Sequence, residues 1–489
     1  MPIENARRRK RTLFITDTAR IFLEARKRDS KAFFFEGAPT IGAPTDVSVI
    51  GFGPFEIIRD NNGVLEKEIR GNTSRIDSPF FPFLAEKIAA LQHAANRAEC
   101  RFQNGGVFGC IGYDAIADLE WRLKAAGYFQ RSRKGGGDLS PEPRAEILVA
   151  KKLIYVDHRK KEAHLIDADP ADTSLRIDDM EEILSAAEGD AKSGYDLIPP
   201  RPNTVHPLEI PQLKPALGYE GFRTGVEKIK DHVREGDIFQ AVLAERFEYQ
   251  LRADPIEVFL HLRRINPAPY SFYFDFGDRI FFGASPEALI RIEGRTIVSH
   301  PIAGTRRRGR TPEEDRKLVR SLLRSRKEAA EHLMLVDLAR NDLGRVSAPG
   351  SVRVRDFRSL RYLSNVMHLV SEVKGELAEG VAALDALKAC FPAGTLSGAP
   401  KIRAMEILAT LEPVPRGLYG GAVVAFDSVG QLDSCIAIRS LEMRGRTAIL
   451  RAGAGIVADS KPEHEYAEVS HKLRALREAI AAAEKEFAS

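Results

Sequence analysis

Six prolines fall between residues 199 and 215, and this concentration constrains the fold of the chain more than any other feature of its sequence. Proline has no backbone N–H and biases the residue before it away from the helical conformation, so the stretch suits neither a helix nor a central strand. It predicts an extended linker over residues 199–218. We expect a strand-rich N-terminal region over residues 1–198 and a second, catalytic region over residues 219–489.

The region before the linker has the pattern of antiparallel strands joined by tight turns. Residues 32–36 and 55–59 are rich in aromatic and β-branched side chains, and residues 60–63 (Asp-Asn-Asn-Gly) form a turn sequence that tolerates left-handed backbone. The other predicted elements are a hairpin over residues 146–156 and 161–167 and two helices over residues 82–98 and 114–126.

The region after the linker alternates helical segments with blocks of short strands. Thr311 is followed by Pro312 and, three residues on, by Glu314, which is the pattern of a capped helix start. Strand blocks with hairpin turns are predicted over residues 270–301 and 418–457, and a last helix begins near Pro462. Short strands with hairpin turns, interrupted by helices, predict an α+β protein with antiparallel sheets.

Composition and charge argue against several functional classes. No apolar run approaches the roughly 18 residues needed to cross a bilayer, so we expect no membrane span. The four cysteines form no metal-ligand spacing and are too few for a disulfide scaffold, which favours a reducing, cytoplasmic setting. Residues 4–11 alone carry the net charge of +4, so the rest of the chain sums to zero, and we expect no nucleic-acid partner.

Two glycine-rich segments imitate nucleotide-binding motifs. Residues 453–458 match GxGxxA, but no parallel strand–helix–strand unit surrounds them. Residues 394–401 are similar to a phosphate-binding loop, but the spacing is wrong and Pro400 removes a backbone donor. We therefore expect neither dinucleotide binding nor nucleotide hydrolysis, although residues 394–401 suit a ligand that bears carboxylates.

Three glutamates lie on apolar faces of predicted helices. Glu331 shares its face with leucines, and Glu465 and Glu468 stand one turn apart on the last helix, beside its apolar stripe. Because a buried unpaired charge is costly, these carboxylates need cations. Spacing alone leaves two interpretations open: salt bridges to arginine or lysine, or a divalent cation such as Mg²⁺, which prefers carboxylate oxygens.

Nine motifs in a fixed order carry a resemblance to a known family. Together they resemble the chorismate-utilising enzymes, most of all the anthranilate synthase component I branch, strongly over residues 220–485 and in outline before that. The motifs are GDIFQAVLAERF (236–247), NPAPYSF (266–272), FGASPEALIR (282–291), PIAGT (301–305), EHLMLVDLARNDLG (331–344), GTLSGAPK (394–401), LYGGAVVAFD (418–427), AIRS (437–440) and RAGAGIVADSKPEHEYAEVSHK (451–472).

The resemblance implies a fold, a substrate and a cofactor. The fold is a large α+β sandwich of two antiparallel sheets with helices packed outside. The substrate is chorismate, and the cofactor is Mg²⁺. Glu331, Glu465 and Glu468 match the magnesium-binding carboxylates of the family.

The resemblance also assigns roles around the substrate. Glu287 matches the general acid that protonates the departing C4 hydroxyl, and His368 matches the histidine tied to pyruvate elimination and ring aromatisation. Ordinary packing is the other interpretation for Thr395 and Tyr419. The positions that match substrate-binding residues are Gly304, Thr305, Thr395, Tyr419, Arg439, Gly453, Gly455 and Lys472.

Two positions favour one reaction within the family. Members that add water to chorismate are expected to have a lysine base where this chain has Gln240, and a neutral amide can orient ammonia but cannot deprotonate water. Members that make 4-amino-4-deoxychorismate often have a nucleophilic lysine where this chain has Ala303. The predicted reaction is therefore amination of chorismate at C2 followed by loss of pyruvate, which gives anthranilate. The alternatives are a 4-amino-4-deoxychorismate synthase component and a non-catalytic paralogue that binds an aromatic ligand.

The resemblance finally bears on a partner and on regulation. None of the cysteines has the Gly-x-Cys-x-Gly context of a glutaminase, so we expect ammonia to come free or from a separate glutamine amidotransferase subunit. The family's tryptophan-feedback motif usually has serine where this chain has Gly37, and Ser271 stands where methionine is common. We therefore expect no feedback inhibition by tryptophan.

Overall fold

The computed structural model of the chain describes most, but not all, of its residues. The described residues are 6–13, 17–38, 43, 45–53, 55–93, 100–125, 142–189, 212–362 and 366–488. The predicted linker lies outside them up to residue 211. Its last part is described and contains strand β11 (Lys214–Pro215), which pairs with β12 (Gln240–Gln250).

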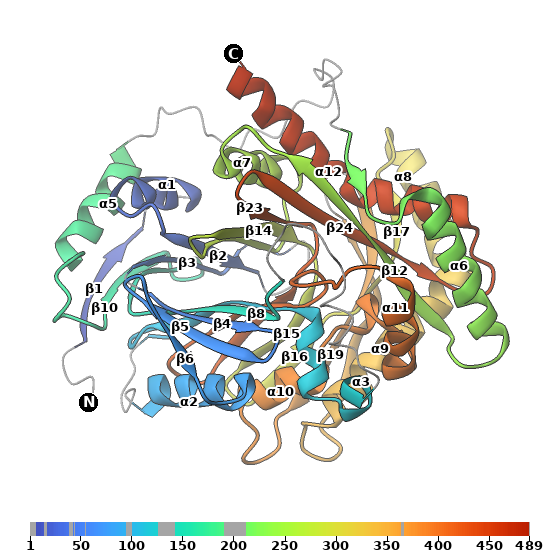
Figure 1. The fold of residues 1–489 in the computed structure, drawn as a ribbon, viewed down its shortest axis with the longest axis horizontal. Coiled ribbons are helices and arrows are strands. Elements are labelled where there is room, and N and C mark those ends of the chain that lie inside the picture. Colours follow the sequence, from blue (N-terminus) through green and yellow to red (C-terminus); the bar gives the residue numbers. More distant parts are fainter. Residues whose placement is uncertain are drawn as a thin grey trace.

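Two twelve-stranded antiparallel sheets form the centre of the molecule (Figure 1). In spatial order, the first sheet consists of β1 (Arg7–Thr12), β10 (Glu162–Asp167), β9 (Lys152–Asp157), β3 (Val47–Phe52), β2 (Phe33–Gly37), β13 (Tyr270–Asp275), β14 (Arg279–Ser285), β23 (Ser440–Arg444), β24 (Thr447–Ile456), β12 and β11, with β20 (Gly398–Ala399) beside β12. The second sheet consists of β17 (Ile302–Arg307), β19 (Val366–Glu376), β16 (Thr296–Ser299), β15 (Ala288–Glu293), β22 (Leu432–Ile436), β21 (Ala422–Phe426), β7 (Gly106–Ile111), β8 (Ala145–Ala150), β4 (Glu56–Asn61), β5 (Val64–Ile69) and β6 (Asn72–Ile76), with β18 (Arg353–Tyr362) beside β19. The predicted α+β fold of two antiparallel sheets is confirmed.

Strands from both sides of the proline-rich segment share each sheet. In the first sheet β2 pairs with β13, and in the second sheet β7 pairs with β21. The space between the sheets is filled by aromatic side chains: the rings of Phe33 on β2 and Phe108 on β7 have centroids 4.7 Å apart. Burial of such rings stabilises the sandwich.

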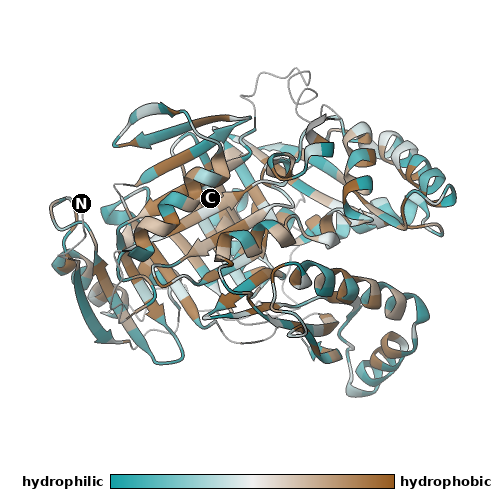
Figure 2. Cartoon of the chain, turned by 90° about the horizontal axis from the view of Figure 1, so that it is seen from below, coloured by the Kyte–Doolittle hydropathy of each residue, from teal (hydrophilic) through white to brown (hydrophobic). Residues whose placement is uncertain are grey.

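Helices cover the outer faces of the two sheets, and the strands between them are rich in hydrophobic residues (Figure 2). On the first sheet pack α1 (Ala19–Arg28), α5 (Ile177–Gly189), α6 (Gly218–Arg234), α7 (Pro255–Ile265) and α12 (Pro462–Ala488). On the second pack α2 (Phe80–His93), α3 (Trp121–Ala125), α9 (Arg326–Gly344) and α10 (Ala383–Cys390), while α11 (Lys401–Leu411) contributes to both cores. Among the described helices, none is long and apolar enough to cross a membrane.

Several local predictions can be compared with the structure. The helix predicted from Thr311 is confirmed as α8 (Pro312–Arg324), and the Thr311 hydroxyl accepts a hydrogen bond from the Glu314 backbone N–H (3.2 Å). The helix predicted near Pro462 is α12, and the predicted turn at residues 60–63 joins β4 to β5.

Two local predictions are wrong. The helix predicted over residues 114–126 is a 3₁₀ turn (Tyr113–Asp118) followed by the short α3. The Asp114 carboxylate accepts a hydrogen bond from the Gly417 backbone N–H (2.9 Å), and this tertiary bond holds the turn against a distant loop. The hairpin predicted over residues 146–156 and 161–167 is confirmed where β9 pairs with β10, but its first strand is wrong: residues 146–156 form two strands, β8 and β9, which separate at Lys151 and enter different sheets.

Candidate active site

The predicted site residues lie on strands, turns and helices that meet where the two sheets approach each other. Glu287 lies between β14 and β15, Thr395 on a 3₁₀ turn (Gly394–Leu396), and His368 on β19. Several pairs among the predicted residues are in direct contact, although their spacing in the sequence did not require it.

Glu287 is a half-buried carboxyl group with a hydroxyl partner. The Thr395 hydroxyl donates a hydrogen bond to its Oε1 (3.2 Å). Burial raises the pKa of Glu287 to about 7, although the Thr395 hydrogen bond and the nearby charge of Lys472 both act to lower it. A carboxyl group with this pKa is partly protonated at neutral pH, so it can act as a general acid.

His368 and Thr305 face each other across the β17–β19 ladder. The two are register partners, and the Thr305 Oγ1 lies 3.0 Å from the His368 Nδ1. Burial lowers the pKa of His368, and the charge of Arg439 lowers it further, against the effect of a hydrogen bond with the Gly304 backbone. The imidazole is therefore neutral at pH 7 and can accept a proton.

Gly304 occupies a position on β17 that only glycine fits without strain. Its φ is +71°, and a Cβ atom there would lie 2.9 Å from the Leu322 side chain and 3.1 Å from the Glu328 carboxylate. The ladder shifts register between Ala303 and Thr305, which is a β-bulge that re-aims the Thr305 side chain.

Gly453 and Gly455 line β24 where it pairs with β12. A Cβ atom at Gly455 would lie 2.3 Å from the Gln240 Nε2, so the Gln240 amide occupies the space that this glycine leaves open. A Cβ atom at Gly453 would lie 2.8 Å from the Leu243 carbonyl oxygen. The glycines thus permit close approach within an antiparallel ladder, as expected for a segment that is not a dinucleotide-binding loop.

Two cationic side chains and a phenol lie beside this ladder. Lys472 on α12 donates from its Nζ to the Gly453 carbonyl oxygen (2.7 Å), and the Arg439 guanidinium donates to the Lys472 carbonyl oxygen. Burial lowers the pKa of Arg439 and raises that of Tyr419 to about 12. The site therefore presents the Arg439 guanidinium, the Lys472 Nζ and a phenolic O–H, which suit a dicarboxylate ligand.

The three predicted metal ligands lie on two helices, Glu331 on α9 and the other two on α12. Burial raises the pKa of Glu331 and of Glu465, and the charge of Glu468 raises both further. Lys472 forms an ion pair with Glu468 (2.7 Å). Glu465 is only 8% exposed and has the Glu468 carboxylate as a neighbour, and a donor set of carboxylate oxygens fits a hard divalent cation.

The oxygen atoms of these three glutamates do not all lie within 4.8 Å of one another. Among the described residues, the groups of potential ligands that meet this limit are His232–Glu235–Asp237 and Glu257–His261–Glu486. A cation bound by Glu331, Glu465 and Glu468 would therefore draw the side chains together or retain water molecules as further ligands, as Mg²⁺ commonly does.

Sequence reasoning missed Arg416, which ties three of these segments together. Its guanidinium donates to the carbonyl oxygen of Leu396, beside Thr395, to that of Val242 on β12 (2.6 Å), and to the Glu412 carboxylate (Nε to Oε2, 2.8 Å). The side chain is 2% exposed, and its guanidinium stacks on the Tyr113 ring, 4.3 Å from the centroid. A buried arginine looks like any surface arginine in sequence, and its place two residues before the LYGG motif is the only signal.

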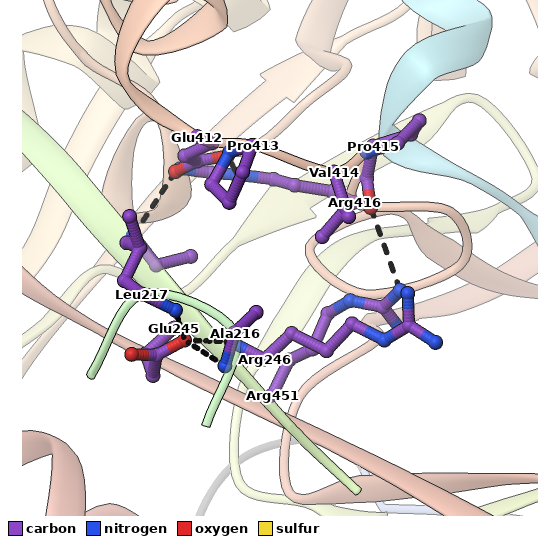
Figure 3. Close-up of a pocket in the computed structure, with 11 residues that line it drawn as sticks. Ala216, Leu217, Glu245, Arg246, Glu412, Pro413, Val414, Pro415, Arg416 and Arg451 are labelled. Atoms are coloured by element: carbon purple, nitrogen blue, oxygen red, sulfur yellow. Dashed lines mark hydrogen bonds and ion pairs between the residues drawn. The ribbon is translucent and has the colours of Figure 1, made fainter. Parts of the chain in front are cut away.

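Arg416 also lines a small pocket (Figure 3). Glu412 and Arg451 line it too, as does Glu245, whose carboxylate accepts hydrogen bonds from the backbone N–H groups of Leu217 (3.0 Å) and Gly218 (2.8 Å). Glu245 thereby fixes the start of α6, directly after the proline-rich segment. The pocket is occupied by internal hydrogen bonds and ion pairs that support the site from outside.

Comparison with known proteins identifies the family. The chorismate binding enzyme model matches residues 32–478. Over 96% of its length the chain is 39% identical to anthranilate synthase component 1 of Methanothermobacter marburgensis, covering 94% of that protein, and over 95% it is 38% identical to that of Geobacillus stearothermophilus, covering 92%. The chain therefore belongs to the chorismate-binding enzymes. Both of these relatives, which align with nearly the whole length of this chain, are anthranilate synthase component 1 proteins.

Solved structures agree with this assignment. Anthranilate synthase component I from Streptococcus pneumoniae superposes with a TM-score of 0.71 and 35% identity, covering 90% of this chain and 94% of that one. The menaquinone-specific isochorismate synthase of Escherichia coli superposes with a TM-score of 0.69 at 18% identity, covering 97% of this chain and 95% of its own. The second likeness concerns the fold alone.

Proposed function

We propose that this chain is the chorismate-converting component of an anthranilate synthase, which forms anthranilate and pyruvate from chorismate and ammonia. The observation that carries the proposal is the Gln240 amide, which lies against Gly455 on β24, where Lys472 also binds. This position holds a neutral group that can accept or donate hydrogen bonds but cannot deprotonate water. Ammonia is already a nucleophile when unprotonated, so this site favours amination over hydration.

The first half of the reaction replaces a hydroxyl by an amino group. Ammonia attacks C2 of chorismate, the ring double bonds shift, and the C4 hydroxyl departs as water with a proton from Glu287. The pKa of about 7 supports this role, because the acid form is available at neutral pH. The substrate carboxylates are bound by Arg439, Lys472 and Tyr419. These contacts hold the ring in place between the attacking ammonia and the Glu287 carboxyl group.

The second half removes pyruvate and makes the ring aromatic. His368 takes the C2 proton, the enolpyruvyl C–O bond breaks, and the electrons of the C–H bond complete the aromatic ring. The enolpyruvyl group leaves as pyruvate once it regains a proton. Thr305 orients the imidazole through its contact with Nδ1, which leaves Nε2 to accept the proton.

Mg²⁺ is part of this proposal, with Glu331, Glu465 and Glu468 as its protein ligands. When bound, the ion neutralises negative charge on the substrate carboxylate and on the leaving group. The support is the raised pKa of Glu331 and of Glu465, which burial causes first and the charge of Glu468 increases. A cation at this place would relieve the repulsion among the three carboxylates.

A separate glutamine amidotransferase subunit that supplies ammonia is also part of the proposal, as is a reducing, cytoplasmic setting. The support for the setting is that all four cysteines are free thiols. Ala303 disfavours the formation of 4-amino-4-deoxychorismate, since the side chain at this position on β17 is not a nucleophile.

Insensitivity to tryptophan completes the proposal. Gly37 lies on β2, and a Cβ atom there would stand 3.0 Å from the Asp433 carboxylate and 3.3 Å from the Tyr270 ring. The Tyr270 hydroxyl donates to Asp433 (2.8 Å), so the place of a serine side chain is filled by an internal hydrogen bond. Tryptophan added to millimolar concentration should leave the initial rate unchanged; inhibition at micromolar concentration would contradict this.

One assay tests the reaction. The purified chain is incubated with chorismate, Mg²⁺ and ammonium, and anthranilate fluorescence is followed together with product analysis. Anthranilate and pyruvate in equal amounts, absent without Mg²⁺, are expected. Isochorismate, salicylate or 4-amino-4-deoxychorismate as the product would overturn the roles given to Gln240 and Ala303.

A further inference from the structure

The charge of the molecule is concentrated in one segment. Residues 306–362 contain sixteen lysines and arginines against eight aspartates and glutamates, a net charge of +8, whereas the whole chain carries +4. The remainder therefore sums to −4. The net charge of the whole chain therefore does not reveal that one segment is basic and the remainder acidic. A surface that is so strongly basic attracts acidic partners.

The same segment exposes large apolar side chains. Five of them are between 36% and 51% exposed, out of eleven such residues in the described chain. They are Leu323 on α8, Leu333 on α9, and Val354, Phe357 and Tyr362 on β18. Exposed aromatic and aliphatic groups among arginines are typical of a protein–protein interface rather than of an ordinary solvated surface.

Direct contacts join the three elements into one surface. The Arg358 guanidinium donates to the Leu323 carbonyl oxygen (3.0 Å), which ties β18 to the end of α8. The His332 and Phe357 rings have centroids 5.9 Å apart, which ties β18 to α9. We call the exposed residues of α8, α9 and β18 the basic face.

Strand β18 gives the basic face an open edge. Among the described strands it pairs with β19 alone, and residues 353–357 are all exposed. An open edge can pair with another chain. A second copy of this protein is disfavoured as that chain. The exposed residues of the basic face include ten lysines and arginines against three aspartates and glutamates, a net charge of +7, so two such faces would repel each other. The like charges thus select for an acidic partner.

We propose that the basic face docks an acidic protein subunit, namely the ammonia-supplying glutamine amidotransferase; this identity of the partner rests on the proposed function. The face lies on elements that hold the candidate site: α9 carries Glu331, and β18 pairs with β19, which carries His368. A subunit seated here contacts the elements that hold the site. Exposed leucine and valine side chains favour a protein partner over a nucleic acid, whose phosphates and bases offer them little.

The test reverses charge on the face without touching the site. Among the described residues, no ion pair or side-chain hydrogen bond involves Arg320, Arg324 or Arg355, so their substitution breaks none. The variant Arg320→Glu/Arg324→Glu/Arg355→Glu is compared with the control Arg75→Glu/Lys228→Glu/Lys485→Glu, which reverses three exposed cationic side chains elsewhere that likewise have no ion pair among the described residues. The probe is the purified amidotransferase subunit of the same organism. Its Kd is measured by titration, and anthranilate formation is measured with ammonium and with glutamine.

We expect the basic-face variant to raise the Kd for the subunit about 100-fold and to lose glutamine-dependent activity in proportion, while ammonium-dependent activity stays within about twofold. The control should match the wild type in all three measurements. An unchanged Kd in the basic-face variant overturns the docking proposal. Tighter binding of a DNA or RNA duplex than of the subunit, abolished by the same variant, overturns the choice of partner. If the wild type forms no anthranilate from ammonium, the proposed function fails, and the Kd comparison still decides the docking.

Discussion

Two regions of the molecule bury carboxylates in different ways. In the sandwich core, Glu146 on β8 accepts hydrogen bonds from Arg59 (3.0 Å) and Arg279 (3.1 Å). In the candidate site, Glu287 has a single hydroxyl partner, and Glu331 and Glu465 have other carboxylates as neighbours. Burial raises the pKa of Glu146 and of Glu287 alike, so burial does not distinguish the two regions.

The difference lies in the guanidinium partners. A buried acid between two arginines keeps its charge and holds strands together, whereas a buried acid without one can change its protonation state or bind a cation. The number of cationic partners therefore separates carboxylates that maintain the fold from carboxylates that perform chemistry. The predictions below test that distinction, from the largest expected effect on turnover to the smallest.

The largest effect is expected from Glu287→Gln, with Glu146→Gln as its counterpart. Glu287→Gln should lose about a thousandfold in kcat because it removes the general acid, while chorismate still binds. Glu146→Gln should instead lower the free energy of unfolding by about 3 kcal/mol, because it leaves two buried guanidinium groups without a counter-charge. Steady-state kinetics and urea unfolding of both variants give the comparison. If Glu287→Gln and Glu146→Gln lost equal turnover per folded molecule, the distinction between catalytic and structural carboxylates would be wrong.

Glu465→Gln should act on the metal rather than on the fold. Removal of one carboxylate ligand should lower turnover at a fixed Mg²⁺ concentration by about 100-fold or more. Thermal unfolding as a function of Mg²⁺ provides a second measurement: the wild type should be stabilised by the ion and the variant should not. A variant that keeps the wild-type Mg²⁺ response would remove Glu465 from the proposed ligand set.

His368→Met should separate the two halves of the reaction. Without the imidazole, pyruvate elimination should slow by about 100-fold, and the aminated intermediate should accumulate. Chromatography of quenched reactions measures the intermediate and anthranilate separately. Thr305→Val serves as the control, because it keeps the ring and removes only its orienting hydroxyl. Normal anthranilate yield from His368→Met would contradict the elimination role.

The fold and the site differ in how far the sequence predicts them. Alternating strand and helix patterns and nine motifs were enough for the antiparallel sandwich. The pairing of β2 with β13 joins residues far apart in the chain, and no local periodicity encodes it. The same holds for Arg416, whose partners Leu396 and Val242 come from separate segments. Helix periodicity placed Glu465 beside an apolar stripe, but its neighbours across the site became visible only in three dimensions.

A pH dependence of the free energy of unfolding should affect turnover least, and it tests the comparison between Glu287 and Glu146 most directly. The pKa of Glu287 is raised from 4.5 to about 7 in the folded chain, so the folded state binds a proton that the unfolded state has already released between these values. The associated stability is present below the unfolded pKa and is lost as the pH rises through the folded one. The raised pKa corresponds to about 3 kcal/mol. Glu287→Gln has no charge to desolvate and should not show this loss.

The measurement is urea unfolding of the wild type and of Glu287→Gln at pH 5 and pH 8. The difference between the two proteins should shift by about 2.5 kcal/mol between these pH values, with the variant gaining relative to the wild type at pH 8. Effects of all other titrating groups cancel in the comparison when the sites are independent. The same protonation should appear in catalysis, where kcat/KM corrected for the concentration of free ammonia should fall above pH 7. A pH-independent stability difference would mean that Glu287 titrates near its ordinary value, and the contrast with the arginine-bound Glu146 would then lose its electrostatic basis.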